Sequence, residues 1–157
     1  MLTHPIPPLF DESSEILILG SFPSVKSRES AFFYGHPQNR FWKVISKVLG
    51  EPEPKSVEEK RILLLSKKIA LWDVIGSCEI VGSSDSSIKN AAPNDLGVIL
   101  NRAKIRKIFL NGRTAEKYYN KYQRGKISIE AECLPSTSPA NAAWSIDRLI
   151  AEWNKIL

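Results

Sequence analysis

The sequence predicts a three-layer α/β/α fold around a short, mostly parallel sheet of about four strands, and two observations support this fold class. Apolar runs of strand length alternate along the chain with amphipathic segments of helix length. The first run, 15–19, contains an unbroken Ile-Leu-Ile-Leu sequence, which is typical of a strand buried on both faces. No internal repeat is visible, and we expect residues 1–157 to form a single domain.

The remaining elements follow from apolar spacing and from residues typical of helix ends. Residues 40–49 have helical spacing and stop at Gly50, and Ser56 with Glu59 forms a capping box that opens a second helix reaching about residue 68. The core side of this second helix is expected at 62–65. The other predicted elements are a strand at 69–75, a polar segment at 76–87, a helix capped by Asn94 or Asp95 and ending near 103, a strand at 107–111, a helix capped by Thr114, a strand at 127–134 and a helix capped by Ser145.

The composition is that of a globular protein with a mild preference for polyanions. Hydrophobic residues make up 43% and charged residues 25%, and 22 Lys and Arg against 17 Asp and Glu give a net charge of +5. This charge is compatible with nucleic-acid binding, although metabolic enzymes can be equally basic. No apolar run approaches the roughly 20 residues of a membrane span, and the first residues lack a signal-peptide pattern. We therefore expect a cytoplasmic protein without a membrane partner.

Cysteine and histidine are scarce, which argues against a metal centre. Cys78 and Cys133 cannot supply the four thiolates of an iron–sulfur cluster or a zinc ribbon. The only histidines are His4 and His36. We expect no metal site and no cofactor.

Polar and small residues stand where the predicted strands end. Because the carboxyl ends of parallel strands meet at one edge of a sheet, a ligand is expected there. The residues at these ends are Gly20, Ser21 and Phe22 after the first strand, Asp73 after the second, Asn111 after the third, and Leu-Pro-Ser-Thr-Ser-Pro at 134–139 after the fourth.

A loop dense in aromatic residues and amides follows the first strand end and runs into a helix at 40. It contains Tyr34, His36 and Asn39. The P-loop, the dinucleotide Gly-x-Gly-x-x-Gly and the Gly-x-Ser-x-Gly elbow are absent. The remaining aromatic faces, amides and hydroxyls suit a pocket that stacks a flat ring and forms hydrogen bonds with its edge.

Three segments resemble one known family. Residues 32–44, Phe-Phe-Tyr-Gly-His-Pro-Gln-Asn-Arg-Phe-Trp-Lys-Val, resemble the matching segment of the uracil-DNA glycosylase superfamily, especially its mismatch-specific branch. Residues 20–24 resemble its first active-site motif, and residues 134–141 resemble its second. The combination is most similar to the hypoxanthine-DNA glycosylase branch, which removes deaminated adenine from DNA. The resemblance runs from about residue 16 to the last helix.

Two departures from the family pattern argue against simple uracil excision. Ser21 and Phe22 stand where many members carry Asn, Asp or Gln-Asp to activate or hold water, and Leu134 replaces the His or Asn that begins the second motif in some branches. In the hypoxanthine branch, the catalytic amide maps onto Asn39.

The resemblance implies a monofunctional DNA glycosylase that hydrolyses the N-glycosidic bond of a flipped deaminated base in double-stranded DNA, with hypoxanthine preferred. Asn39 would hold the attacking water or form a hydrogen bond with the departing base, and Phe22 would stack on that base. The residues at 140–143 would fill the gap in the base stack. The implied base-binding residues are Gly20, Ser21, Phe22, Tyr34, His36, Asp73 and Asn111, and the implied DNA contacts are Lys26, Arg28, Arg40, Ser136 and Ser138.

Simpler roles and other functions remain open at this stage. Asn39 can serve as a helix cap, Phe22 can fill the core, and Asp73 and Asn111 are common turn residues. The alternative functions are a uracil or mixed-specificity glycosylase, a nucleic-acid-binding relative without catalysis, and an enzyme acting on free nucleosides. We expect a monomer.

Overall fold

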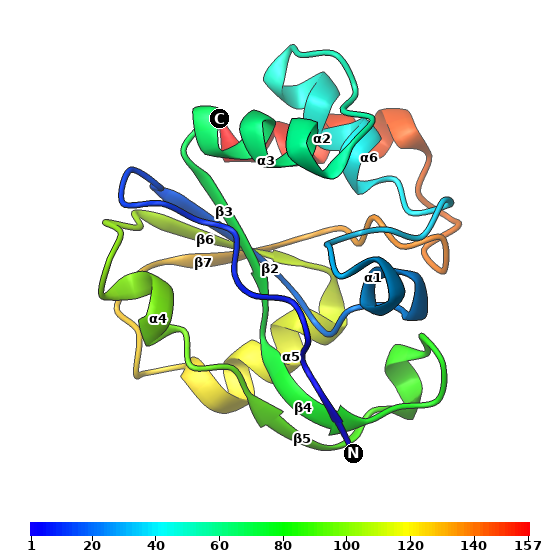
Figure 1. Cartoon of the computed structure of the whole chain (residues 1–157), viewed down its shortest axis with the longest axis vertical. Helices are drawn as coiled ribbons and strands as arrows, with labels where there is room; N and C mark the ends of the chain where they lie inside the picture. The colour runs from blue at the N-terminus through cyan, green and yellow to red at the C-terminus, as the bar shows by residue number, and fades with distance from the viewer.

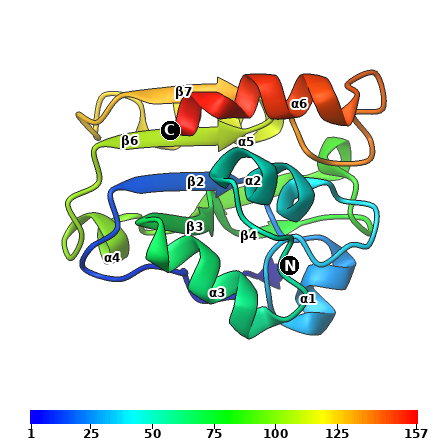
Figure 2. The ribbon, with the colours of Figure 1, turned by 90° about the horizontal axis from the view of Figure 1, so that it is seen from above.

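The computed structural model describes residues 1–157 and confirms the predicted α/β fold (Figure 1). Its central sheet has the order β3-β2-β6-β7, and every neighbouring pair is parallel. The strands run side by side with their carboxyl ends at the same edge (Figure 2). Their bounds are β2 Ile16–Gly20, β3 Ile69–Asp73, β6 Lys107–Asn111 and β7 Ala131–Leu134.

Helices cover both faces of this sheet and complete the three layers (Figures 1 and 2). One face carries α2 Phe41–Leu49, α3 Val57–Ser66 and α6 Ile146–Trp153, and the other carries α4 Gly97–Leu100 and α5 Arg113–Gln123. Helix α1, Val25–Ser30, lies at the carboxyl ends of the strands, and short 3₁₀ turns occupy Asp85–Ser87 and Asn154–Ile156. No helix has the length and apolar character needed to cross a membrane.

A second, antiparallel sheet was missed by the sequence prediction. It has the order β1-β4-β5, with β1 Leu2–Thr3, β4 Ile75–Glu79 and β5 Lys89–Pro93. Residues 76–87 are mostly exposed, as their polar composition predicts, but the prediction missed β4, which pairs with β1 on one side and with β5 on the other.

The chain changes sheets directly after Asp73. The Asn94 side chain stabilises this change, because its Nδ2 donates to the carbonyl oxygens of Asp73 at 2.9 Å and Ile75 at 3.2 Å. Asn94 therefore holds the end of β3 in place, whereas Asp95 accepts the Gly97 N–H at the start of α4.

Most predicted helix ends are confirmed. Ser56 and Ser145 accept hydrogen bonds from the first turns of α3 and α6, and Gly50 ends α2. The predicted Thr114 cap was wrong, because α5 already begins at Arg113 after Gly112. Gly112 has a φ of +96°, and a Cβ there would lie 2.9 Å from the Ser136 Cβ, so the chain needs glycine where β6 meets the last loop.

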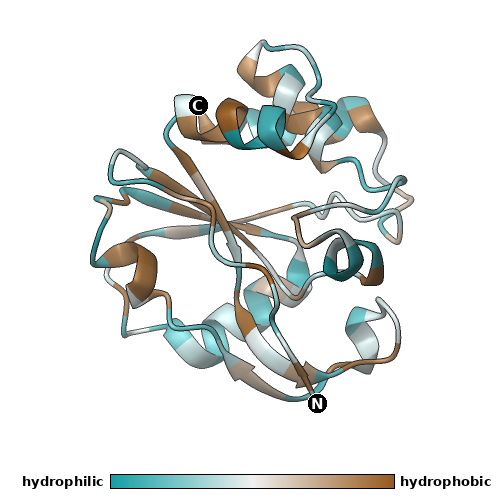
Figure 3. Ribbon diagram, in the orientation of Figure 1, coloured by the Kyte–Doolittle hydropathy of each residue, from teal (hydrophilic) through white to brown (hydrophobic).

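Other details also differ from the prediction, and the helix expected to end near 103 stops at Leu100. Ile62 is 58% exposed rather than part of the core side of α3, and only 131–134 of the predicted strand 127–134 is extended in the sheet. Hydrophobic residues gather on the strands and on the inner sides of the helices (Figure 3). Two buried indoles also hold the loops at the strand ends, because Trp42 donates to the Phe33 carbonyl and Trp153 to the Pro135 carbonyl.

Candidate active site

One cavity of about 1190 Å³ opens at the carboxyl ends of the parallel strands. Small-molecule sites commonly measure about 300–1,000 Å³, so this cavity has room for a nucleotide and part of its backbone. The β4–β5 connection, 83–86, forms an additional wall. The predicted site residues that line the cavity are Gly20, Ser21, Phe22, Tyr34, His36, Asn39, Asp73, Asn111, Ser136 and Ser138.

Asn39 is held with a defined orientation at the entrance to α2. Its Oδ1 accepts the backbone N–H of Phe41 at 2.9 Å and the Thr137 hydroxyl at 2.9 Å. Since a backbone N–H can only donate, the Phe41 contact identifies the oxygen of the amide. The Nδ2 group forms no hydrogen bond within the protein and is available to a ligand. Asn39 therefore contributes to the helix start and also presents a free amide donor.

Thr137 connects Asn39 to the end of β6. Its side chain is fully buried, its Oγ1 accepts from Asn111 Nδ2 at 3.1 Å, and its backbone N–H donates to Asn111 Oδ1 at 3.1 Å. Both ends of the Asn111 amide are thus bound to Thr137, although Asn111 lines the cavity. Thr137, which lies between the two serines of the predicted turn, was not among the predicted site residues.

Gly20, Tyr34 and Asp73 meet at the floor of the cavity. A Cβ on Gly20 would lie 2.4 Å from Asp73 Oδ1 and 3.0 Å from Tyr34 Oη, so only glycine permits this arrangement. The Tyr34 hydroxyl is buried without a hydrogen-bond partner. Burial, and then the charge of Asp73, raise the Tyr34 pKa, so the phenol stays protonated.

Tyr34 is further constrained by its backbone and its ring. Its φ is +52°, a conformation that costs free energy in a non-glycine residue and is typical of functional sites. The ring stacks on Phe41, with 4.1 Å between the ring centroids.

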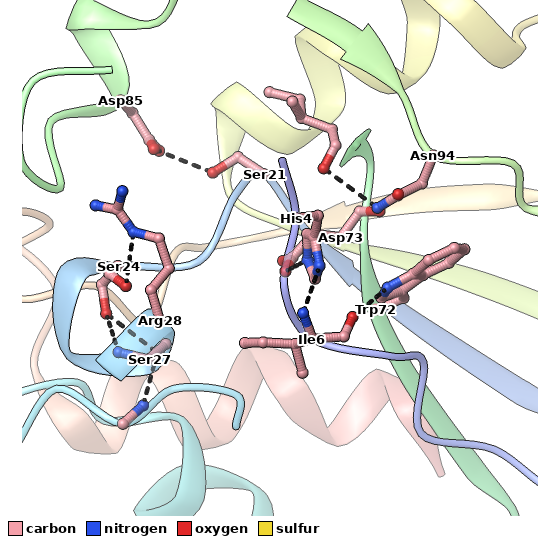
Figure 4. A network of polar contacts seen from close by, with 12 residues as sticks. His4, Ile6, Ser21, Ser24, Ser27, Arg28, Trp72, Asp73, Asp85 and Asn94 are labelled. Atoms are coloured by element: carbon pink, nitrogen blue, oxygen red, sulfur yellow. Dashed lines mark hydrogen bonds and ion pairs between the residues drawn. The ribbon is translucent and has the colours of Figure 1, made fainter. Parts of the chain in front are cut away.

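Asp73 has a partner that sequence reasoning did not identify. His4 Nε2 lies 2.7 Å from Asp73 Oδ2, and both side chains are buried (Figure 4). The two residues are 69 positions apart, and no local pattern links them.

Ser21 also has an unexpected partner. Its hydroxyl donates to Asp85 Oδ1 at 3.0 Å, which brings a carboxylate from the β4–β5 connection beside the first active-site turn (Figure 4). Asp85 is an exposed residue, but desolvation of its carboxylate beside the cavity raises its pKa; the Ser21 hydrogen bond opposes this change, and the Asp73 charge adds to it.

Phe22 and His36 both have groups that face the cavity. Phe22 is buried beside the edge of the His4 ring, with the Arg28 guanidinium 5.9 Å from its centroid. His36 Nδ1 accepts the Gln38 N–H at 3.0 Å, which leaves Nε2–H as a donor. The backbone N–H groups of Ser21 and Phe22 take part in no hydrogen bond of the fold.

The predicted basic contacts differ in what they bind. The Arg40 guanidinium donates to the carbonyl oxygens of Ser138 and Asn141, each at 3.1 Å, and to that of Trp144. Arg40 therefore holds the last loop in place through its guanidinium, and its predicted contact with DNA stays a prediction. Arg28 donates to the Gly82 carbonyl at 2.7 Å and links α1 to the β4–β5 connection.

The other predicted DNA contacts have an ammonium or a hydroxyl group that a phosphate can reach. Lys26 is exposed and lies 3.6 Å from Glu29. The hydroxyls of Ser136 and Ser138 accept backbone N–H groups, each at 3.1 Å, and their hydrogens remain available for phosphate oxygens.

No group of three or more His, Cys, Asp or Glu side chains is placed to hold a metal ion, and both cysteines are free thiols. An amide and aromatic side chains line a cavity at the carboxyl ends of a parallel sheet, which is the place where α/β enzymes bind their ligands. The profile of the Uracil DNA glycosylase superfamily matches residues 7–157. The chain belongs to the Uracil DNA glycosylase superfamily.

Individual relatives cover nearly the whole chain. A Methanosarcina acetivorans protein named hypoxanthine DNA glycosylase is 37% identical over 158 residues, which are 99% of this chain and 98% of that protein. A Methanosarcina barkeri protein of the same name is 33% identical over 137 residues, covering 86% and 85%.

A solved structure agrees with these matches. The solution NMR structure of a Methanosarcina acetivorans protein, provisionally described as a uracil DNA glycosylase, has a TM-score of 0.84 at 37% identity and covers 99% of this chain and 96% of that one. The matches confirm the family and the DNA glycosylase function predicted from the motifs, with DNA as the substrate.

Proposed function

We propose that this protein removes hypoxanthine from double-stranded DNA by hydrolysing its N-glycosidic bond, as a monofunctional glycosylase of base-excision repair. The observation that carries the proposal is the Asn39 amide, whose oxygen is bound twice and whose Nδ2 is free at the cavity. The names of the two Methanosarcina relatives support hypoxanthine as the base. We further propose that residues 1–157 act as one domain and as a monomer.

The first step is extrusion of the damaged nucleotide from the duplex. Flipping costs roughly a few kcal/mol and costs less at a mismatch such as inosine opposite thymine. The hydroxyls of Ser136 and Ser138 would bind phosphates beside the flipped nucleotide, and Lys26 and Arg113 would supply charge at the rim. Arg113 lines the cavity, and its side chain is 91% exposed.

The second step is recognition of the flipped base. Deamination of adenine turns N1 from an acceptor into an N–H donor and replaces the amino group by a carbonyl. Asp73 Oδ1 is an acceptor for that N–H, and the protonated Tyr34 hydroxyl is a donor for the carbonyl oxygen. Phe22 would stack on the ring face.

The third step is cleavage, in which negative charge develops on the leaving base. Asn39 Nδ2–H would donate to a base acceptor, and the free N–H groups of Ser21 and Phe22 would add to this stabilisation. Because Asn39 Oδ1 already accepts two hydrogen bonds, we favour contact with the base over activation of water. Hypoxanthine leaves more readily than adenine because its carbonyl stabilises the anion.

The test uses duplex oligonucleotides that carry a single inosine, uracil or xanthine, followed by alkaline cleavage of abasic sites. Cleavage at inosine that depends on alkali supports the proposal. Equal cleavage at uracil would instead support a mixed-specificity enzyme. Tight duplex binding without abasic sites would support an inactive relative, and release of hypoxanthine from free inosine alone would support a nucleoside enzyme.

Asn39→Ala and Asn39→Asp are the companion variants. Removing a donor that stabilises developing charge commonly lowers the rate about 10²–10³-fold, and we expect a loss of that size for Asn39→Ala. A variant with wild-type activity would rule out the role proposed for Asn39.

A further inference from the structure

His4 does not itself line the cavity but contacts Asp73, which does, and it precedes the family match, which begins at residue 7. Its side chain is 2% exposed and that of Asp73 is 6% exposed, so the 2.7 Å contact between them is shielded from water. A buried polar contact of this kind is retained only when its groups are satisfied and well oriented.

The surroundings of His4 fix its tautomer. The Ile6 backbone N–H donates to Nδ1 at 3.2 Å, so Nδ1 carries the lone pair and Nε2 carries the hydrogen. Nε2–H therefore donates to Asp73 Oδ2. Figure 4 shows Ile6, His4 and Asp73 in sequence along this line of contacts.

Packing also fixes the plane of the imidazole. The ring meets Phe22 edge-on, with centroids 5.8 Å apart and an interplanar angle of 88°, and meets Trp72 at 6.1 Å and 74°. The His4 backbone N–H donates to the Gly76 carbonyl at 2.7 Å, and the Trp72 indole donates to the Ile6 carbonyl at 3.0 Å. The imidazole is held by backbone and side chains alike.

The His4 contact also determines where the second carboxylate oxygen of Asp73 lies. With Oδ2 bound to His4, Asp73 Oδ1 is directed towards the space left by Gly20, beside the Tyr34 hydroxyl. One acceptor and one donor are thus fixed next to each other on the cavity floor. Without the His4 contact, the carboxylate could rotate and present the wrong oxygen or no oxygen.

We propose that His4 is a positioning residue for base recognition, which holds Asp73 so that Oδ1 accepts the ring N–H created by deamination. The inference rests on the proposed function. Asp73 Oδ1 and the Tyr34 hydroxyl together would select a base edge on which a ring N–H stands beside a carbonyl. Hypoxanthine, xanthine and uracil share this edge. Adenine and cytosine present a ring nitrogen lone pair there, which repels the carboxylate. Guanine carries the same pair, so this contact separates deaminated bases from adenine and cytosine only.

The test compares His4→Ala with His4→Gln in single-turnover kinetics on an inosine duplex. The glutamine amide can take the place of Nε2–H, whereas alanine leaves Asp73 Oδ2 without a donor. We expect His4→Ala to raise the half-saturating enzyme concentration about 10-fold, in line with a lost hydrogen bond to a charged group, with a smaller effect on the saturating rate. His4→Gln should recover most of this loss. Thr3→Ala, on the neighbouring exposed residue, is the matched control and should match wild type.

Further measurements separate positioning from folding. Thermal unfolding of each variant identifies the temperature range in which all are folded, and kinetics are compared within it. In an Asp73→Asn background, His4→Ala should have little further effect. A full additional loss in that background, wild-type kinetics of His4→Ala, or a folded His4→Gln that is as impaired as His4→Ala would each overturn the proposal. Absence of hypoxanthine release by the wild type would instead refute the proposed function.

Discussion

Replacing Thr137 with valine removes one hydroxyl from a fully buried side chain and keeps its shape. The hydroxyl accepts from Asn111 Nδ2 at 3.1 Å and donates to Asn39 Oδ1 at 2.9 Å. The substitution therefore leaves the Asn111 amide hydrogen without an acceptor and leaves Asn39 with the Phe41 N–H as its one remaining anchor.

These contacts predict the size of the change in Tm and of the change in the single-turnover rate. An unsatisfied buried donor lowers the free energy of unfolding by about 1–3 kcal/mol. For a chain of this size, a loss of about 2 kcal/mol lowers Tm by about 4–8 °C. The loss of one of two anchors on Asn39 removes a contact of about 0.5–1.5 kcal/mol, so the single-turnover rate should fall about 3–10-fold. This is less than the loss expected for Asn39→Ala, because the free Nδ2 donor is still present.

The assay is single-turnover release of hypoxanthine from an inosine duplex, together with thermal unfolding. Thr137→Ser is the control, since it retains the hydroxyl and should keep most of the activity. In the Asn39→Ala background, Thr137→Val should still lower Tm but should not lower the rate further. If the rate falls by the same factor in both backgrounds, Thr137 does not act through Asn39 and the reasoning is refuted.

Three further predictions concern the cavity. Gly20→Ala should lower activity by 10-fold or more, because its Cβ would lie 2.4 Å from Asp73 Oδ1 and displacements of about 1 Å can cost about 10²-fold; wild-type kinetics would contradict this. Tyr34→Phe should leave Tm unchanged or raised, since it removes a buried hydroxyl without a partner, while weakening binding of the inosine duplex in a titration. Asp85→Asn should raise Tm at neutral pH, because the raised Asp85 pKa means that its charged form is disfavoured in the folded state. Because Asp85 is an exposed residue, this gain in Tm should be small; it is complete above the folded pKa and should vanish below the ordinary value of 3.8. A gain that is constant across pH would argue against desolvation of the carboxylate as its cause.

The parallel sheet could be predicted because strands covered on both faces need unbroken apolar runs, and three such runs, at 16–19, 69–72 and 108–110, stand out in the sequence. The fourth segment alternates polar and apolar residues, and its strand was predicted too long. The positions of Gly20, Asp73 and Asn111 followed from that topology, since parallel strands bring their carboxyl ends together. The antiparallel sheet could not be predicted in the same way. Its strands β4 and β5 carry mixed polar residues, and β4 lies between β5 and the N-terminal strand β1, which is distant in the sequence.

Each site residue that the sequence did not reveal contacts a partner that lies far away along the chain. His4 and Asp73 are 69 residues apart, Ser21 and Asp85 are 64 apart, and Asn39 and Thr137 are 98 apart. Only the folded chain reveals such pairs. Arg40 differs from these residues because it was predicted from a positive charge beside a motif. In the structure its guanidinium donates to carbonyl oxygens of the last loop, which the sequence did not reveal.

The N-terminal strand has a practical consequence for comparisons within the superfamily. Leu2 and Thr3 pair with Cys78 and Ser77, and the following residue, His4, contacts Asp73 at the cavity floor, so contacts that support the site begin upstream of residue 7, where the family match starts. A truncated protein starting at residue 7 would keep every shared motif and lose this strand.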